Sequence, residues 1–173
     1  MQLDLLAIGL TTIDITVYPV ASLPDDETGQ IVEKIMLSPA GTAGGTALVV
    51  QKLGLRTAIA SAVGDDPQGQ LIRSVFDAAG VDTSLLAVDP AWPTSTTVLP
   101  IRPNGDRPNW HMMGASIFAP VTDAVFAALA RTAAVHWGGV GFPGAAGKGA
   151  DLLQAARERG LFTSCDLIAP SDA

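Results

Sequence analysis

The chain has 173 residues, of which 48% are hydrophobic and 16% charged, and its formal net charge is −7. This length suffices for one domain with a sizeable core, and the composition excludes a disordered chain. The acidic balance and the lack of any basic run argue against nucleic acid and anionic membrane surfaces as partners.

The N-terminal region predicts strands. Residues 5–9 form a short apolar run that ends in glycine, which is typical of a buried parallel strand. The run is not a signal peptide, because no basic residues precede it and Asp4 interrupts it. Residues 13–18 alternate apolar and polar side chains and predict a half-exposed strand on which Asp14 points away from the apolar face. A less regular alternation over residues 30–37 predicts another exposed strand.

Three glycines lie within residues 38–47, directly before an apolar run. Glycine permits close backbone approach and sharp turns, and a helix that begins after them would present unpaired N–H groups and the positive end of its dipole. We therefore interpret residues 41–45 as a turn that binds a hydroxyl-rich or anionic small molecule. The alternative is a plain loop before a helix, which is expected over residues 46–54.

A second strand and helix follow. Residues 57–64 predict a buried strand, and residues 68–79 carry apolar side chains at helical spacing up to Gly80. Between them, the Asp-Asp-Pro of residues 65–67 is better explained as a helix cap than as a metal site. This order of elements indicates a parallel sheet with right-handed crossovers.

A hairpin interrupts this rhythm. Residues 94–102 and 107–112 read as extended segments on either side of Asn104-Gly105, which is a strong hairpin signal. We expect the hairpin to form a small separate sheet with the two exposed N-terminal strands. Trp110 and His111 alternate along one strand, so at most one of them faces a cleft.

The strand and helix rhythm then returns. The pattern predicts helices over residues 121–131 and 149–160, and strands over residues 134–139 and 161–167. Asp166 lies at the end of the last strand, where ligands gather in open α/β sheets. A sugar or phosphate contact and a purely structural hydrogen bond explain it equally well.

Several chemically notable residues receive a structural interpretation. Cys165 is the sole cysteine and cannot form an internal disulfide. We expect it to be a small buried residue, in keeping with a reducing cytoplasm. His111 and His136 lack matched acidic or thiol partners in the sequence, so no metal site is expected, and Trp137 is expected in the core. No apolar stretch reaches the length of a membrane span.

Four segments in this order resemble the N-terminal half of the ribokinase-like (PfkB) carbohydrate kinases, over nearly the whole chain. They are the strand with its aspartate at 8–14, the glycine segment 39–47, residues 53–69 with 79–83, and the strand and hairpin over 94–106. The resemblance implies a layered α-β-α core with a mainly parallel sheet and a small β lid, with the C-terminal half of that fold missing. The expected core comprises residues 1–10, 38–90 and 114–173, and the lid 11–37 and 91–113.

The resemblance also implies an activity. In this family ATP, with Mg²⁺, phosphorylates a hydroxyl of a sugar or nucleoside that is held between lid and core. Asp14 matches the aspartate that bonds sugar hydroxyls, although on sequence alone an ordinary solvated strand residue is the better explanation. Gly41 matches a glycine of the sugar-binding turn. Thr96 is expected where the returning lid strand reaches the substrate, and Gly45 stands where the family has asparagine. Further candidate contacts are Thr42 and Trp110 to the acceptor, and Asp166 to a phosphate or the cleft.

The resemblance assigns the catalytic base and most of the ATP site to residues beyond Ala173, so no catalytic residue and no turnover are expected from this chain alone. The alternative is a non-catalytic carbohydrate-binding or dimerisation module, a truncated kinase remnant. We expect a cytoplasmic homodimer that assembles through the lid. A dinucleotide-dependent dehydrogenase is disfavoured, because residues 9–14 lack the cofactor fingerprint.

Overall fold

A computed structural model describes residues 2–24, 27–141 and 148–167, and its centre is a five-stranded sheet. The strands lie in the order β5-β4-β1-β8-β9, and every neighbouring pair is parallel. This arrangement confirms the mainly parallel core sheet. The strands are β1 (Leu3–Gly9), β4 (Thr57–Gly64), β5 (Asp82–Asp89), β8 (Thr132–Val140) and β9 (Phe162–Leu167).

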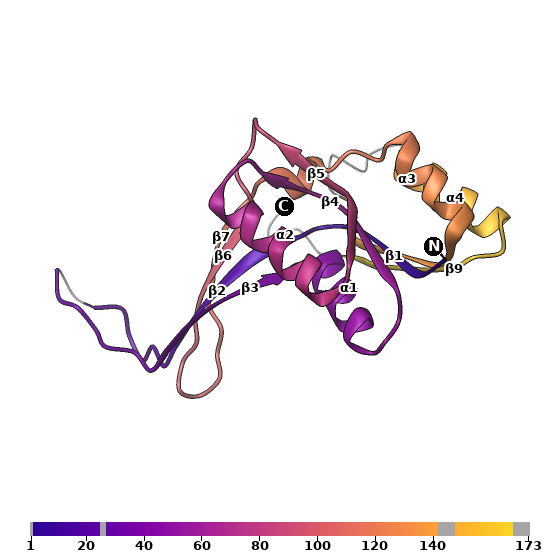
Figure 1. Cartoon of the computed structure of the whole chain (residues 1–173). Coiled ribbons are helices and arrows are strands. Elements are labelled where there is room, and N and C mark those ends of the chain that lie inside the picture. The colour runs from indigo at the N-terminus through magenta and orange to yellow at the C-terminus, as the bar shows by residue number, and fades with distance from the viewer. Residues whose placement is uncertain (1, 25–26, 142–147, 168–173) are drawn as a thin grey trace.

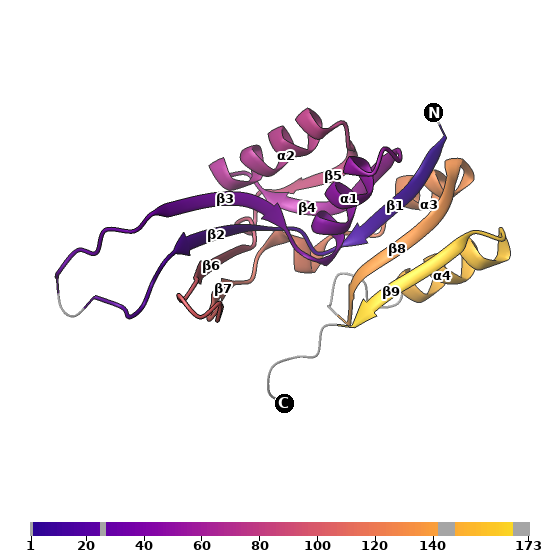
Figure 2. The ribbon, with the colours of Figure 1, turned by 90° about the horizontal axis from the view of Figure 1, so that it is seen from below.

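Helices cover both faces of this sheet (Figures 1 and 2). One face carries α1 (Thr42–Lys52) and α2 (Pro67–Ala79). The other carries α3 (Asp123–Ala128) and α4 (Lys148–Glu158). Short 3-10 helices are η1 (Ala115–Phe118) and η2 (Leu129–Arg131), so the helix expected over residues 121–131 is shorter and ends in a 3-10 turn. None of the helices in the described ranges is long and apolar enough to span a membrane.

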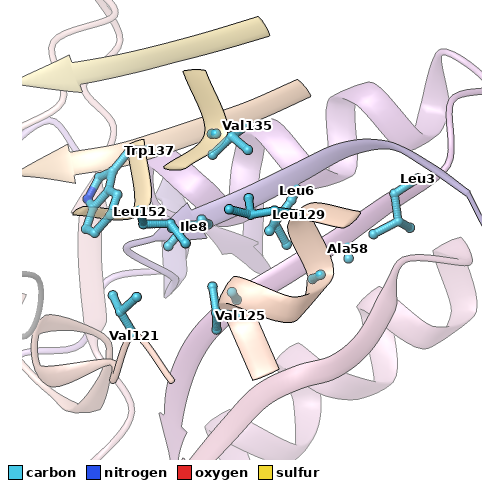
Figure 3. Packing of buried hydrophobic residues seen from close by; sticks show 13 residues of the cluster. Leu3, Leu6, Ile8, Ala58, Val121, Val125, Leu129, Val135, Trp137 and Leu152 are labelled. Atoms are coloured by element: carbon cyan, nitrogen blue, oxygen red, sulfur yellow. The ribbon is translucent and has the colours of Figure 1, made fainter. Parts of the chain in front are cut away.

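Two hydrophobic clusters hold the layers together, one on each face of the sheet. Along β1, Leu6 and Ile8 belong to the cluster under α3 and α4, whereas Leu5 and Ala7 belong to the cluster under α1 and α2. Figure 3 shows the first cluster, in which Trp137 is 3% exposed, as expected for a core residue. Because successive strand residues point to opposite faces, a continuous apolar run suits a sheet covered on both sides.

A second, four-stranded sheet projects from one end of the core (Figures 1 and 2). Its order is β3-β2-β6-β7, in which β2 and β6 are parallel and the other pairs antiparallel. The expected separate sheet is therefore present. The strand expected from residue 30 is β3, and it begins at Lys34. The expected boundary between core and lid at residue 38 stays a prediction. The strands are β2 (Thr12–Tyr18), β3 (Lys34–Ala40), β6 (Thr96–Pro100) and β7 (Trp110–Met112).

Helix α1 begins at Thr42 and not at residue 46, so the expected glycine turn is the cap and first turn of the helix. Its small residues Ala43, Gly44 and Ala47 are buried. Glycine disfavours helix by about 1 kcal/mol. Here the small residues let the helix lie close against the core sheet, and that tertiary contact outweighs the low propensity.

Cys165 is exposed, which corrects the expectation of a buried thiol. It lies on β9, which is an edge strand of the five-stranded sheet in the described part of the chain. Phe162 and Leu167 on the same strand are also exposed, at 71% and 78%. An apolar sequence run at a sheet edge lacks the neighbouring strand and helices that would bury it.

Candidate functional site

The carboxyl end of β1, the start of β2 and the N-terminus of α1 meet at one junction. Leu10 connects these elements through its backbone. Its N–H donates to the Gly138 carbonyl at 3.1 Å, and its carbonyl accepts from two N–H groups in the first turn of α1, at 3.0 and 3.1 Å. Thr12 pairs with Ala40, so the second sheet starts directly beside it. Since ligands of open parallel sheets lie beyond the carboxyl ends of the strands, this junction is the candidate site.

Gly41 occupies a position that only glycine fits. Its φ is 85°, and a Cβ there would lie 2.6 Å from the Leu10 carbonyl oxygen. The N–H groups of Ala43 and Gly44 donate to that same oxygen, and the N–H of Gly45 donates to Gly41. The expected row of unpaired amides is therefore wrong, because the carbonyls of Leu10 and Gly41 already accept from the N–H groups of Ala43, Gly44 and Gly45.

Beside this capped turn, Thr42 has a polar atom without a partner in the described residues, and Gly45 has free space around it. The Thr42 Oγ1 is buried and has no hydrogen-bond partner among the described residues. Such a group is normally satisfied by a ligand or an ordered water. A Cβ at Gly45 would meet nothing within 4 Å, so this position has room for a side chain or for part of a ligand.

Asp14 lies on what we call the polar face of the second sheet, formed by Thr12, Asp14, Thr97 and His111. Asp14 is the register partner of Thr97, and Thr97 is the register partner of His111. Side chains of laterally paired residues point to the same face. The Thr97 Oγ1 lies 3.0 Å from the His111 Nδ1 and 3.4 Å from the Thr12 Oγ1.

The carboxyl group of Asp14 is half-buried, and this burial sets the direction of its pKa shift. Burial raises the pKa of Asp14, and it prevails over the hydrogen bond from Thr97 and the charge of His111, which both lower that pKa. A carboxylate with lost hydration and remaining lone pairs accepts hydrogen bonds readily. The polar face therefore presents an acceptor suited to ligand hydroxyls.

Thr96 and Trp110 lie on the opposite face of the second sheet. Thr96 is the register partner of Ile13, and Trp110 is the register partner of Val98. The Thr96 hydroxyl donates to the carbonyl of Thr94 at 3.0 Å. The structure thus does not bring Thr96 or Trp110 together with Asp14, and their contact with an acceptor stays a prediction.

Trp110 is 54% exposed and lines a hollow of about 200 Å³ with Val20 and Arg102. Sequence reasoning named Thr96 on this strand and missed its neighbour Thr97, which is the register partner of Asp14. The only signal for it is strand register, since a shift by one residue moves every side chain to the other face.

Asp166 forms a hydrogen bond to the C-terminal end of β8. Its Oδ1 accepts a hydrogen bond from the N–H of Gly139 at 2.6 Å, and its Oδ2 lies 3.7 Å from the His136 Nε2. The His136 Nδ1 in turn lies 2.9 Å from the Ser164 Oγ. His136 therefore has an acidic neighbour in Asp166, which the sequence does not reveal because the two residues are far apart along the chain. Contact of Asp166 with a phosphate stays a prediction.

Asp66 caps α2, as the sequence predicts. It accepts from the N–H of Gly69 at 2.8 Å and from the hydroxyl and N–H of Thr94 at 2.6 and 2.7 Å. Partial burial raises the pKa of Asp66, but these hydrogen bonds outweigh it and hold the pKa below the ordinary value. Within the described ranges, no three or more His, Cys, Asp or Glu side chains are placed to hold a metal ion.

Comparison with known proteins agrees with this architecture. The pfkB family carbohydrate kinase domain matches residues 2–173. The chain is 34% identical over 94 residues to a nucleoside kinase of Methanothermobacter thermautotrophicus, which covers 53% of the chain and 30% of that protein. It is 33% identical over 85 residues to a fructokinase of Vibrio alginolyticus, which covers 49% of the chain and 26% of that protein.

Solved structures show the same fold. The ribokinase of Arabidopsis thaliana, complexed with ribose and ATP, superposes with a TM-score of 0.80 at 20% identity, covering 96% of this chain and 54% of that one. A microbiome-derived acarbose kinase superposes with a TM-score of 0.78 at 26% identity, again covering 96% and 54%. The chain spans about half the length of these structures, and its matches to the curated relatives span less than a third of them. With the family match over residues 2–173 and the ribokinase fold, the chain belongs to the pfkB family of carbohydrate kinases.

Proposed function

We propose that this chain provides the acceptor-binding part of a sugar kinase that transfers a phosphoryl group from ATP to a hydroxyl of a sugar or nucleoside. Its similarity to a nucleoside kinase and a fructokinase supports this acceptor class. The observation that carries the proposal is the half-buried carboxylate of Asp14, which lies on the polar face close to the junction at Leu10.

Three features of the chain would hold the acceptor. Asp14 accepts hydrogen bonds from two adjacent hydroxyls, which a single carboxylate does with its two oxygens. The buried hydroxyl of Thr42 takes a further polar group of the acceptor. The space at Gly45 admits a substituent where the family pattern has asparagine. Holding an acceptor in one orientation is a large part of phosphoryl-transfer catalysis.

ATP and Mg²⁺ enter this proposal through the family. Among the described residues, no three or more His, Cys, Asp or Glu side chains are placed to hold a metal ion, and Mg²⁺ at phosphoryl-transfer sites needs only one or two carboxylates beside phosphates and waters. We therefore assign no residue of this chain to the metal and derive no step through it. The contribution of the chain is to bind and orient the acceptor and, with the second sheet as a lid, to exclude water.

The face of the second sheet that carries Trp110 supports a role in dimerisation. On this face Ile35, Leu37 and Met112 are exposed at 60%, 51% and 47%. We propose that a second copy covers it. Sedimentation velocity should give a dimer for the natural chain and a monomer for Leu37→Glu, and a monomeric natural chain would contradict this assembly.

Thermal unfolding with a panel of sugars and nucleosides tests the proposed function. A ligand at 100 times its Kd stabilises the folded state by about 2.7 kcal/mol, so a true acceptor raises Tm measurably. ADP release from ATP and Mg²⁺ with that acceptor would identify catalysis. Binding without ADP release fits both the acceptor-binding part of a kinase and the non-catalytic module, because no turnover is expected from these residues alone. A panel in which no compound raises Tm would contradict both.

A further inference from the structure

His111 is placed to contact whatever Asp14 binds. It shares the polar face with Asp14, and Thr97 lies between them in the register of three adjacent strands. The His111 side chain is exposed. Its Nδ1 is engaged by Thr97 at 3.0 Å, so the ring is held in one orientation.

The hydrogen bonds of the polar face determine which ring nitrogen carries the proton. The Thr12 hydroxyl donates to the carbonyl oxygen of Ser95 at 2.8 Å, because a carbonyl can only accept. A threonine hydroxyl has one proton, so Thr12 has none left to donate across its 3.4 Å contact with the Thr97 hydroxyl.

The single proton of Thr97 goes to the Asp14 carboxylate, in the hydrogen bond that acts to lower the pKa of Asp14, because a charged acceptor binds it more strongly than a neutral hydroxyl or imidazole does. Thr97 therefore has no proton left for His111. The Thr97 oxygen must accept from His111, which places the imidazole proton on Nδ1.

A neutral imidazole protonated at Nδ1 carries a bare lone pair on Nε2. The polar face then presents two groups that only accept, the Asp14 carboxylate and the His111 Nε2. Such a pair suits a neutral ligand that supplies several O–H donors and disfavours an anion such as phosphate.

We propose that His111 is a second acceptor-binding residue, whose Nε2 accepts a hydrogen bond from a hydroxyl of the sugar or nucleoside while Thr97 holds its ring and its tautomer. This inference rests on the proposed function and adds to it a specificity residue. His111 would therefore favour acceptors that carry a further hydroxyl in addition to those that bind to Asp14.

Two substitutions separate ligand contact from a merely structural role. His111→Asn places an amide nitrogen near the Nδ1 position, so it keeps the bond to Thr97 but offers no acceptor at the Nε2 position. His111→Gln reaches the Nε2 position with an amide oxygen but gives up the bond to Thr97. Arg107→Ala, in the exposed loop before β7, serves as the control.

Calorimetric titration of the chain with D-ribose, D-fructose and inosine, together with thermal unfolding, provides the readouts. For the probe that binds, we expect His111→Asn to weaken binding about fivefold to tenfold with Tm unchanged, in line with the loss of one hydrogen bond. His111→Gln should bind more tightly than His111→Asn, and Arg107→Ala should bind like the natural chain. Long-range ¹H–¹⁵N spectra of the neutral ring should show the proton on Nδ1.

Natural-strength binding by His111→Asn, or a proton on Nε2, would overturn this inference and leave the proposed function intact. If the natural chain binds none of the three probes, the proposed function fails and the inference fails with it.

Discussion

The carboxylate of Asp66 holds both the hydroxyl and the N–H of Thr94, at 2.6 and 2.7 Å, across 28 residues of sequence. The Thr94 hydroxyl in turn accepts from the N–H of Gly64 at 2.9 Å. One carboxylate thus joins the end of β4, the start of α2 and the segment that leads into β6. This contact fixes the second sheet on the core.

Asp66→Ala should therefore destabilise the chain by about 2 kcal/mol, as expected for the loss of a helix cap together with buried donors left unpaired. Urea unfolding at neutral pH measures this. Asp65→Ala is the matched control, because Asp65 is exposed and its removal should change the free energy of unfolding by less than about 0.5 kcal/mol. Equal stability of the two variants would show that Asp66 does not join these elements.

Asp4 and Arg56 should make stability depend on acid pH. Hydrogen bonds from the side chain and backbone of Arg56 lower the pKa of Asp4 to about 2. The unfolded value is about 3.9, so this contribution is present above that pH and is lost as the pH falls through the folded pKa. Between pH 4 and pH 2, the Tm of the natural chain should fall more steeply than that of Asp4→Asn. Parallel curves would contradict the assignment.

The stability effect at Asp14 should have the opposite sign. Burial raises the pKa of Asp14 above its unfolded value, so ionisation at neutral pH disfavours the folded state. Asp14→Asn should keep or increase the free energy of unfolding, and Asp14→Ala should stay within about 1 kcal/mol of the natural chain. A large fall in Tm for both variants would make Asp14 a structural residue.

Gly41 and Gly45 should respond differently to added side chains. Gly41→Ala should destabilise by about 2 kcal/mol or more, because its φ of 85° and the Leu10 carbonyl at 2.6 Å leave no place for a Cβ. Gly45→Asn should be neutral or slightly stabilising, since its Cβ meets nothing within 4 Å and asparagine disfavours helix less than glycine. Chemical denaturation of the two variants measures the difference, and similar losses in both would refute it.

Much of the core follows from local sequence pattern. The apolar runs of β1 and β4, the cap at Asp66 and the stop at Gly80 all lie where the pattern predicts them. These features depend on residues within one or two turns of each other. Family resemblance also anticipates the second sheet.

The features that local pattern did not predict depend on distant partners. α1 starts at Thr42 because the carbonyl of Leu10, far away in sequence, binds its first turn. The polar face contains Thr97 rather than Thr96 because β2 and β6 pair in that register. Cys165 is exposed because β9 forms an edge of the sheet in the described part of the chain. Single-sequence periodicity contains no information about these pairings.

We propose that the Asp14 carboxylate binds hydroxyls of a polyol, and matched calorimetric titrations of the natural chain and Asp14→Asn test this proposal. With the sugar or nucleoside that raises Tm most, at neutral pH, the account predicts about 10-fold to 100-fold weaker binding by Asp14→Asn, the usual effect of losing hydrogen bonds to a charged group. Equal Kd values for the two proteins, with both fully folded, would contradict it.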